Sequence, residues 1–484
     1  MKNKRIDRRR FLVNSLQAAA GAGLVAGCDK RTVIGTDDRP PSTPVGLAQK
    51  LSLSPAGVYS VDLSWTAHDG TDITGAKTET AIFYNVYRKT DVQASFDAVP
   101  IATLLPANSF SDSSTEVQDA FVRLTSTPGI VFEYRISAVD ATRVNESPLS
   151  DAFAVPIQPF IDIFYVTEPE AVPGTMLMQP NIQADVVQTM VDAVVMKMTG
   201  LATIDAAWES LFPALSAATL IGIKINTLGM GNVSTKPQVI DAIVNGLTQM
   251  LGGTYPPHNI IVFDDRGKDS HMKYAGYTVR NDPATYRITS THYNTTLDPA
   301  SPITIQQPDA DLWGSTIPVF TVTQRLSKIV EAVDYIVNVP VLKDHIQAGI
   351  TFSMKNLYGL VDNPGQLHDN MCNPFIPALY NTETNGVKLS DKIRIIVGDA
   401  LVGCSTGGPA GGPNIKPCTI VVGTDPVAMD KWALDKVNSY RSAKAQIPLT
   451  YVKTASQDAR HIFYASQPPY SLGSTNYAPR EVIV

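Results

Sequence analysis

The sequence predicts a multidomain protein with an N-terminal all-β sandwich and a C-terminal α/β domain that contains a mostly parallel sheet. Three observations lead to this prediction. The chain has 484 residues, which is too long for one ordinary compact core. Residues 44–157 alternate apolar and polar positions between turn residues. Residues 158–484 instead contain short apolar runs that alternate with helical segments.

The composition is that of a folded globular protein. The apolar fraction is 44%, the charged fraction is 17%, and the formal net charge is −6. Basic residues are concentrated only in the first ten positions. This balance argues against a disordered acidic tail and against a nucleic-acid-binding surface, so we expect no nucleic-acid partner.

Residues 1–28 resemble a twin-arginine export signal that ends in a bacterial lipobox. Arg8 and Arg9 precede the run "FLVNSL", and "VAGC" ends at Cys28. The resemblance implies export by the twin-arginine route, lipid attachment at Cys28, and a periplasmic or cell-envelope protein held at a membrane surface. Plain cleavage nearby and an uncleaved signal-anchor helix are the alternatives. The run is short and polar for a membrane span.

Residues 29–43 are polar and proline-rich, and we interpret them as a tether. The twin-arginine route generally carries folded proteins, which favours a cofactor or metal bound before export. The chain beyond the signal keeps Cys372, Cys404 and Cys418 without a CxxC pair. We therefore expect no built-in iron–sulfur cluster and no four-cysteine zinc site. Cys404 and Cys418 could pair in an oxidising compartment, although sequence does not establish their geometry.

Residues 44–157 resemble a fibronectin type III domain. Alternating runs contain Trp65 in "LSW", Tyr84 and Tyr87 in "YNVYRK", and Tyr134 in "YRISAVDA". Such domains mostly serve as spacers or as modules that contact proteins and glycans. The resemblance therefore implies an envelope protein or glycan as the partner of this domain, and no chemistry within it.

Five apolar runs in residues 158–484 predict buried, mostly parallel strands covered by helices: 220–226, 259–265, 335–342, 393–400 and 418–425. Two helices are predicted between them. Residues 236–251 have an apolar stripe behind Pro237, and residues 425–437 begin with Asp425 as N-cap and Pro426 at the first helical position.

Polar side chains occur at or just after each predicted strand end. Because loops at the carboxyl ends of parallel strands meet in one crevice, we expect these side chains to converge on a ligand. The alternative for any one of these residues is that it is polar only because the chain becomes exposed to water at the end of the strand. The set comprises Lys224, Asn226, Asp264, Asp265, Arg266, Lys343, Asp344, His345, Asp399 and Asp425.

The stretch "KDHIQAGITFSMKNLYGL" predicts a helix with Lys355 in its middle. Ile350, Met354 and Leu357 would form an apolar stripe, and Thr351 and Lys355 would follow one another along its flank. The helix N-terminus would favour an anion. The structural alternative is that Lys355 pairs with an aspartate and only stabilises the fold.

Several motifs in order resemble domain-of-unknown-function family 362. They are "IGIKIN", "NVPVLKDHIQAGITFSMKNLYGLV", a later His368, "GCSTGGPAGGP" and "IVVGTDPVAMDKWALD". The resemblance covers about residues 220–440. No activity is securely attached to the family. Some members carry ferredoxin-like cysteine clusters, which this chain lacks.

The first functional hypothesis is an enzyme for an anionic small molecule that bears a phosphate or a carboxylate. Its candidate catalytic residues are Lys224, Lys343, His345, Lys355 and Asn356, with lysines as anion ligands, bases or Schiff-base nucleophiles. Thr351 and the loop glycines would bind the ligand or a cofactor of unknown identity, the glycines being Gly407, Gly408, Gly411 and Gly412. A divalent metal is the second form of this site, with ligands His345, His368, Asp399 and Asp425.

The second hypothesis is a noncatalytic envelope module that binds a ligand or another protein. The membrane anchor and the accessory β domain favour it. Lysines within apolar segments favour the enzyme, because such lysines destabilise a fold unless they are paired or used.

Overall fold

The computed structural model describes residues 39–54, 56, 58–76, 82–124, 129–143, 145–229, 233–264, 269–290, 297–306, 321–384, 387–451 and 458–484. The predicted signal, with Arg8, Arg9 and Cys28, lies outside the described residues. The chain divides into two compact units. One contains the described residues of 39–48, 63–110 and 133–154, and the other contains those of 49–62, 111–132 and 155–484. None of the helices within the described ranges has the length and apolar character to cross a bilayer.

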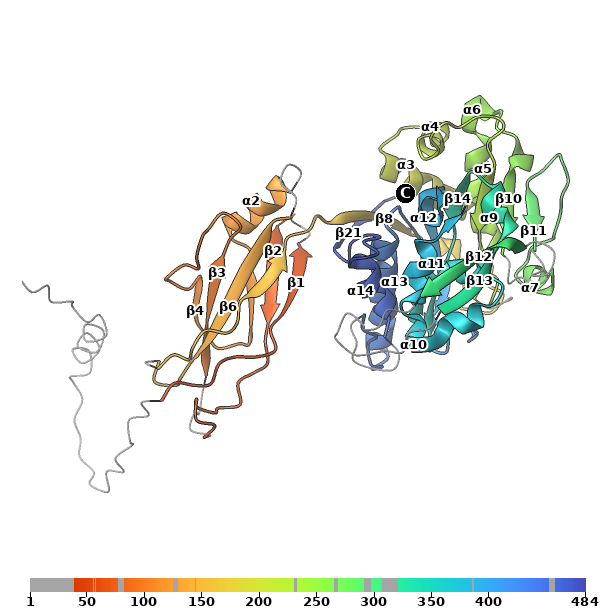
Figure 1. Cartoon of the computed structure of the whole chain (residues 1–484). Helices are drawn as coiled ribbons and strands as arrows, with labels where there is room; N and C mark the ends of the chain where they lie inside the picture. The colour runs from red at the N-terminus through yellow and green to blue at the C-terminus, as the bar shows by residue number, and fades with distance from the viewer. Residues whose placement is uncertain are drawn as a thin grey trace, which may run out of the picture. The chain divides into compact units, whose positions relative to one another are not determined.

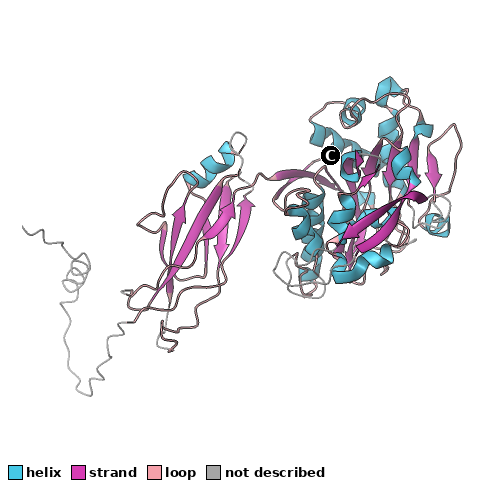
Figure 2. Cartoon of the chain, viewed as in Figure 1, coloured by secondary structure: helices cyan, strands magenta, loops and turns pink. Residues whose placement is uncertain are grey.

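The N-terminal region is rich in β-strands and contains two sheets (Figures 1 and 2). The three-stranded sheet has the order β1-β2-β5 and the four-stranded sheet has the order β4-β3-β6-β7. Trp65, which follows β2, packs edge-on against Tyr84 of β3, with 5.1 Å between ring centroids. The elements are β1 (Ala48–Leu53), β2 (Tyr59–Ser64), β3 (Phe83–Lys89), β4 (Ala102–Leu105), β5 (Ser109–Asp112), α2 (Thr115–Arg123), β6 (Val131–Val139) and β7 (Phe153–Pro156).

The C-terminal region contains a ten-stranded mixed sheet with the main order β11-β10-β9-β14-β19-β20-β8-β21. Strand β15 also pairs with β19, and β16 pairs with β15. The strands of this sheet are β8 (Ile161–Thr167), β9 (Ile221–Lys224), β10 (Ile260–Phe263), β11 (Arg287–Thr289), β14 (Tyr335–Asn338), β15 (Val341–His345), β16 (Gly349–Thr351), β19 (Ile393–Cys404), β20 (Thr419–Gly423) and β21 (Tyr477–Glu481). Smaller hairpins are formed by β12 (Leu297–Gln306) with β13 (Thr321–Ser327), and by β17 (Glu383–Thr384) with β18 (Val387–Lys388).

Helices cover both faces of this sheet (Figure 2). One buried cluster joins α3 and α5 to the sheet through Val191, Ile243, Ile223 and Val337. The other joins α13 and α14 to the opposite face through Trp432, Ile462, Ile336 and Ile396. The helices are α3 (Ala184–Thr199), α4 (Ile204–Glu209), α5 (Pro237–Thr248), α6 (Met250–Gly253), α7 (Asp269–Tyr274), α9 (Lys328–Ala332), α10 (Asp369–Cys372), α11 (Phe375–Tyr380), α12 (Leu389–Lys392), α13 (Pro426–Ala443) and α14 (Arg460–Ser466), with short 3₁₀ turns η1 (Pro169–Ala171), η2 (Pro257–Asn259), η3 (Lys355–Leu360) and η4 (Pro364–His368).

The prediction of a mostly parallel sheet is only partly right. Strands β10, β9, β14 and β19 are mutually parallel, as expected. Strand β20 runs antiparallel to both of its neighbours, β19 and β8. Parallel neighbours need a crossover, usually a helix, and residues 405–418 form none between β19 and β20. The chain therefore returns in the opposite direction.

The predicted helix around Lys355 is wrong. Strands β15 and β16 form an antiparallel hairpin, with Lys343 opposite Thr351, and only the short 3₁₀ turn η3 follows. Gly349 has φ +69°, and a Cβ at this position would lie 2.6 Å from the backbone nitrogen of Ala459. The hairpin thus packs against a segment more than one hundred residues away, which fixes it as β-structure. Leu357 and its apolar neighbours are buried as predicted, but in a different backbone form.

The three cysteines among the described residues are buried free thiols. They are Cys372, Cys404 and Cys418, so the pairing considered for Cys404 and Cys418 is not formed. Burial raises the pKa of the Cys404 thiol to about 11.

Candidate functional site

A cavity of about 280 Å³, here called the site cavity, lies at the carboxyl ends of β9 and β10 and beside the β15–β16 hairpin. Its lining comes from segments that are far apart in the sequence, as expected for the crevice at the end of parallel strands. The lining residues are Lys224, Asn226, Leu228, Asp264, His345, Thr351, Lys355, Asn356, Tyr358, Gly359, His368, Pro409 and Ala410.

The last residue of β9, Lys224, forms a buried ion pair with Asp264. The strand register places Lys224 opposite Phe263, so the residue after β10 reaches the lysine. The Lys224 Nζ donates to Asp264 Oδ1 at 3.1 Å and to the carbonyl of Ile225 at 2.7 Å. The backbone N–H and the hydroxyl of Thr227 donate to the second oxygen of Asp264. This pairing supplies the carboxylate that a lysine at such depth requires.

Next to this ion pair, hydrogen bonds between asparagine side chains connect the ends of the strands. The Asn226 Nδ2 donates to Asn356 Oδ1 at 3.1 Å, and Asn356 Nδ2 donates to Asn338 Oδ1 at 2.8 Å. The Lys343 Nζ donates to Asn226 Oδ1 at 2.8 Å. Asn356, predicted as catalytic, therefore connects β9, β14 and η3 through its amide. A buried network whose members are all hydrogen-bonded holds its side chains in one arrangement.

Lys343 lies beside the cavity but does not line it. Its side chain is fully buried. Burial lowers the pKa of Lys343 to about 7, and the charges of Lys355 and Lys224 act in the same direction while Asp264 opposes them. Desolvation disfavours the ammonium form, so this lysine changes its protonation state near neutral pH.

Lys355 reaches the cavity from η3 and meets a histidine. Its Nζ lies 3.1 Å from His368 Nε2, while His368 Nδ1 lies 2.7 Å from the carbonyl oxygen of Pro364. A carbonyl only accepts, so Nδ1 carries the proton and Nε2 offers its lone pair to the Lys355 ammonium. The same ammonium lies over the ring of Tyr358, 3.9 Å from its centroid. Lys355 and a neutral His368 thus share one hydrogen-bonded proton.

His345 is also neutral. Its Nδ1 accepts from the backbone N–H groups of Gln347 and Ala348, both at 3.1 Å, so the ring proton lies on Nε2. Burial, reinforced by the charge of Lys355, lowers the pKa of His345 far below its usual range. Its ring stacks with that of His368, with 5.3 Å between centroids.

The four predicted metal ligands do not form one metal site. Only His345 and His368 come together, and in each the Nδ1 atom is engaged with the backbone. The remaining nitrogen of His368 faces an ammonium group, which is an unsuitable neighbour for a cation. The described part of the chain holds no group of three or more His, Cys, Asp or Glu side chains that could bind a metal ion.

The two aspartates proposed with them have structural partners. Asp399 lies inside β19 rather than at its end, and it accepts from the backbone N–H groups of Lys236 and Leu401. Asp425 follows the reversed strand β20, at the edge of the sheet opposite the site cavity. It caps α13 by accepting from Val427 and Ala428, which confirms the predicted helix start. Asp265 and Arg266 lie outside the described residues.

The glycine-rich loop binds an internal carboxylate. The Gly408 N–H donates to Asp344 Oδ1 at 2.8 Å. A Cβ on Gly408 would lie 2.0 Å from the carbonyl oxygen of Asp344, so only glycine permits this approach. Gly407, Gly411 and Gly412 are not among the residues that line the cavity, to which the loop contributes Pro409 and Ala410.

Thr351 is placed as the sequence suggested, on the cavity wall. It is 5% exposed, and its hydroxyl has no hydrogen-bond partner among the described residues. Tyr358 was not among the predicted site residues. Gly359, in the motif "KNLYG", packs against the buried pair, and a Cβ there would lie 2.5 Å from Asp264 Oδ1.

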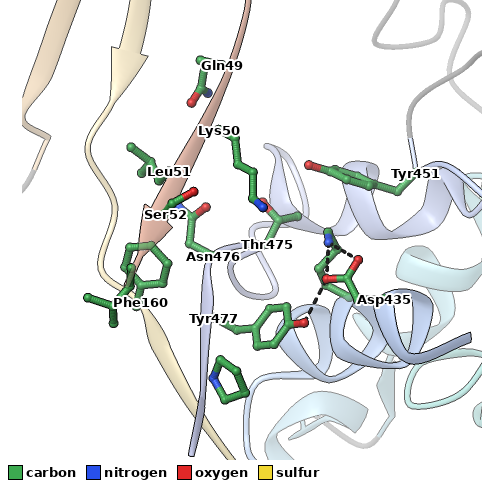
Figure 3. Close-up of a pocket in the computed structure, with 13 residues that line it drawn as sticks. Gln49, Lys50, Leu51, Ser52, Phe160, Asp435, Tyr451, Thr475, Asn476 and Tyr477 are labelled. Atoms are coloured by element: carbon green, nitrogen blue, oxygen red, sulfur yellow. Dashed lines mark hydrogen bonds and ion pairs between the residues drawn. The ribbon is translucent and has the colours of Figure 1, made fainter. Parts of the chain in front are cut away.

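A second polar cluster lies on α13 and β21, and Figure 3 shows Asp435 and Tyr477 within it. Asp435 accepts from Lys431 Nζ at 2.6 Å and from the hydroxyl of Tyr477 at 2.9 Å. Burial, followed by the charge of Asp435, raises the pKa of Tyr477 well above its ordinary value. The three groups satisfy one another, so this cluster requires no ligand.

A family model matches part of the C-terminal region. Residues 221–435 match the family model described as "Domain of unknown function (DUF362)", which supports the resemblance found in the C-terminal motifs. The matched range is less than half of the chain and contains every residue that lines the site cavity. The search of curated proteins gave no match.

Among solved structures, the chain is similar to "a Fn3-like protein from Clostridium thermocellum" at 23% identity, over 24% of this chain and 90% of that chain, with a TM-score of 0.16. It is also similar to the protein of "Myokine structure" at 13% identity, over 25% of this chain and 98% of that chain, with a TM-score of 0.17.

Proposed function

We propose that the C-terminal domain is an enzyme domain that binds an anionic small molecule in the site cavity. One observation carries this proposal: two lysines, Lys224 and Lys355, line the same small cavity together with a single carboxylate, Asp264. With His345 and His368 neutral, the lining has a net positive charge. An anion is the ligand that this charge attracts.

Acid–base chemistry is the reaction type that the side chains support best. Lys355 and His368 lie within hydrogen-bond distance, so a proton can pass between them. Stacking of His345 on His368 adds a second imidazole whose Nε2 carries a proton. Lys224 is held by Asp264 and has the role of a fixed charge rather than a base.

A noncatalytic binding module is the second candidate. It is favoured by the rigid partners of the cavity residues, since the Lys224–Asp264 pair and the asparagine network fix the site without any group that must move. In this case the cavity would hold an anion and present it without converting it.

We further propose the setting of this domain. The motif around Arg8 and Arg9 supports export by the twin-arginine route, and Cys28 supports a lipid anchor in the cell envelope. The alternation of residues 44–157, with Trp65 and Tyr84 in the core, supports a fibronectin type III module that contacts an envelope protein or glycan.

The binding step is tested by isothermal titration of the full chain with inorganic phosphate and with benzoate. At least one should bind, and Lys355→Met should weaken binding more than tenfold, because a charge-assisted hydrogen bond contributes about 1.5–3 kcal/mol. Lys197→Met is the matched control, since Lys197 is exposed on α3. Equal binding by wild type and Lys355→Met would refute the proposed site.

Catalysis is tested without a known substrate. Small carboxylates and phosphate esters are incubated with the chain in deuterium oxide, and NMR follows the loss of carbon-bound hydrogen. Acid–base activity predicts exchange that depends on both Lys355 and His368. Binding without exchange for every ligand would favour the noncatalytic candidate.

A further inference from the structure

The glycine-rich loop at the site cavity lacks the arrangement expected of a phosphate cradle. Such cradles use free backbone N–H groups of a glycine loop. Here the Gly408 N–H is bound to Asp344, and the backbone of Gly407 also contributes to holding this carboxylate. What the loop presents to the cavity is Pro409, which has no N–H, and Ala410. Asp344 thus takes the place that a phosphate oxygen would need.

The charge of the cavity matches a single negative charge. Its lining carries two ammonium groups and one carboxylate, while both imidazoles are neutral because His345 Nδ1 accepts from Gln347 and His368 Nε2 accepts from Lys355. Lys224 is already paired with Asp264 at 3.1 Å. A monoanion therefore balances the cavity, whereas phosphate near neutral pH carries up to two charges and pyrophosphate more.

Thr351 supplies an unused hydrogen bond in the same place. Thr351 lines the cavity, and its buried hydroxyl has no partner among the described residues. A buried hydroxyl without a partner is unfavourable, and a ligand oxygen that accepts from it would remove this cost. The position is independent of the lysines, because Thr351 ends β16 while Lys355 lies on η3.

Besides Asn226 and Asn356, the remaining wall is apolar, and the space is small. Leu228, Tyr358, Gly359, Pro409 and Ala410 surround the polar groups. The volume of about 280 Å³ is just below the range of about 300–1,000 Å³ that is usual for sites of drug-sized ligands. A nucleotide or a sugar phosphate would leave many of its polar groups against apolar walls.

We propose that the ligand of the site cavity is a small monocarboxylate with an apolar body, whose carboxylate is held by the Lys355 ammonium and the Thr351 hydroxyl. This inference rests on the proposed function and narrows its ligand class. The apolar body lies against Tyr358, Pro409 and Ala410. Lys224, fixed by Asp264, contributes long-range attraction rather than a direct charge contact.

The experiment is a set of isothermal titrations of the full chain with benzoate, benzamide, inorganic phosphate and pyrophosphate. Benzoate is expected to bind at least tenfold more tightly than each of the other three. Thr351→Val should weaken benzoate about tenfold, the loss expected for one hydrogen bond to a charged group. Thr189→Val is the matched control, because Thr189 is exposed on α3, and Thr351→Ser should retain binding because it keeps the hydroxyl.

The outcomes separate this inference from the function on which it rests. Binding of phosphate or pyrophosphate but not of benzoate, lost in Lys355→Met, would overturn the monocarboxylate and leave the anion site intact. Benzoate binding that is equal in wild type and Thr351→Val would overturn the role of the hydroxyl. If no probe binds in a Lys355-dependent manner, both proposals fail. Thermal melting of each variant shows whether it folds. If Thr351→Val does not fold, Thr351→Ser becomes the test, and weaker benzoate binding by this variant would overturn the role of the hydroxyl.

Discussion

Two regions of the C-terminal sheet use similar sequence patterns and reach opposite results. In the parallel region, β10, β9, β14 and β19 end at one edge, and Lys224 and Asp264 meet there. In the β20 region, an equally apolar strand is also followed by an aspartate, but the strand is reversed and Asp425 caps α13 at the other edge. Strand direction decides which polar residues reach the site, and an apolar run does not reveal its direction.

The largest expected effect comes from breaking the ion pair of the parallel region. Asp264→Ala would leave Lys224 buried without its carboxylate and the Thr227 donors without an acceptor. We expect a loss of about 3–5 kcal/mol in the free energy of unfolding. Urea unfolding of the full chain, followed by circular dichroism, measures the change.

The control lies in the outer part of the same sheet. Asp162 and Arg480 form an ion pair whose side chains are 46% and 49% exposed, so Asp162→Ala should change stability by less than about 0.5 kcal/mol. The double variant Lys224→Met, Asp264→Leu should be more stable than Asp264→Ala alone, because it leaves no unpaired charge. Equal losses for Asp264→Ala and Asp162→Ala would contradict the distinction between the two regions.

The next largest expected effect is a pH dependence of the free energy of unfolding, caused by Lys343 next to the parallel region. Burial lowers the pKa of Lys343 to about 7, whereas the unfolded chain keeps the ordinary value of 10.5. Between these values the unfolded chain binds the extra proton, so stability rises with pH. Between about pH 8 and pH 9.5 the slope should be about 1.4 kcal/mol per pH unit.

Lys343→Met removes the titrating group and should abolish this slope. Its overall stability will also change, because Asn226 loses a donor, so the comparison concerns the slope alone. Urea unfolding at several pH values provides both curves. An equal slope in wild type and variant would show that Lys343 keeps its proton in the folded protein.

The smallest effect is expected in the β20 region. Asp425→Ala removes the acceptor for Val427 and Ala428 at the start of α13, and should lower stability by about 1 kcal/mol. Because Asp425 lies at the opposite edge from the site cavity, benzoate or phosphate binding should be unchanged. Titration calorimetry checks this, and weaker anion binding in the variant would place Asp425 in the site after all.

Much of the sheet could be predicted from local sequence. The runs at 220–226, 259–265 and 393–400 form β9, β10 and β19, because strands buried on both faces require continuous apolar residues. Helix α5 begins at Pro237, as its position at the first helical turn indicated.

The errors have specific physical causes. Ile350, Met354 and Leu357 have helical spacing, but the segment forms a hairpin that packs at Gly349 against Ala459, a tertiary contact that no local pattern contains. Lys224, His345, Thr351 and Lys355 do meet at one cavity. The predicted metal ligands do not, because only His345 and His368 reach the cavity while Asp399 and Asp425 bind backbone N–H groups elsewhere. The orientation and the tautomer of His345 and His368 depend on hydrogen bonds that form only in the folded chain, so the sequence alone did not predict them.

The residues that line the site cavity are spread along the chain from Lys224 to Ala410. This sequence separation affects how the protein folds. No single supersecondary unit contains the cavity, so a chain that has folded only as far as β14 lacks the η3 residues and the glycine-rich loop. Contacts of such high sequence separation form late and slowly. A ligand that binds only the finished cavity would shift the folding equilibrium towards the native chain. Anion binding during refolding or synthesis would therefore begin only when all segments of the cavity have folded together.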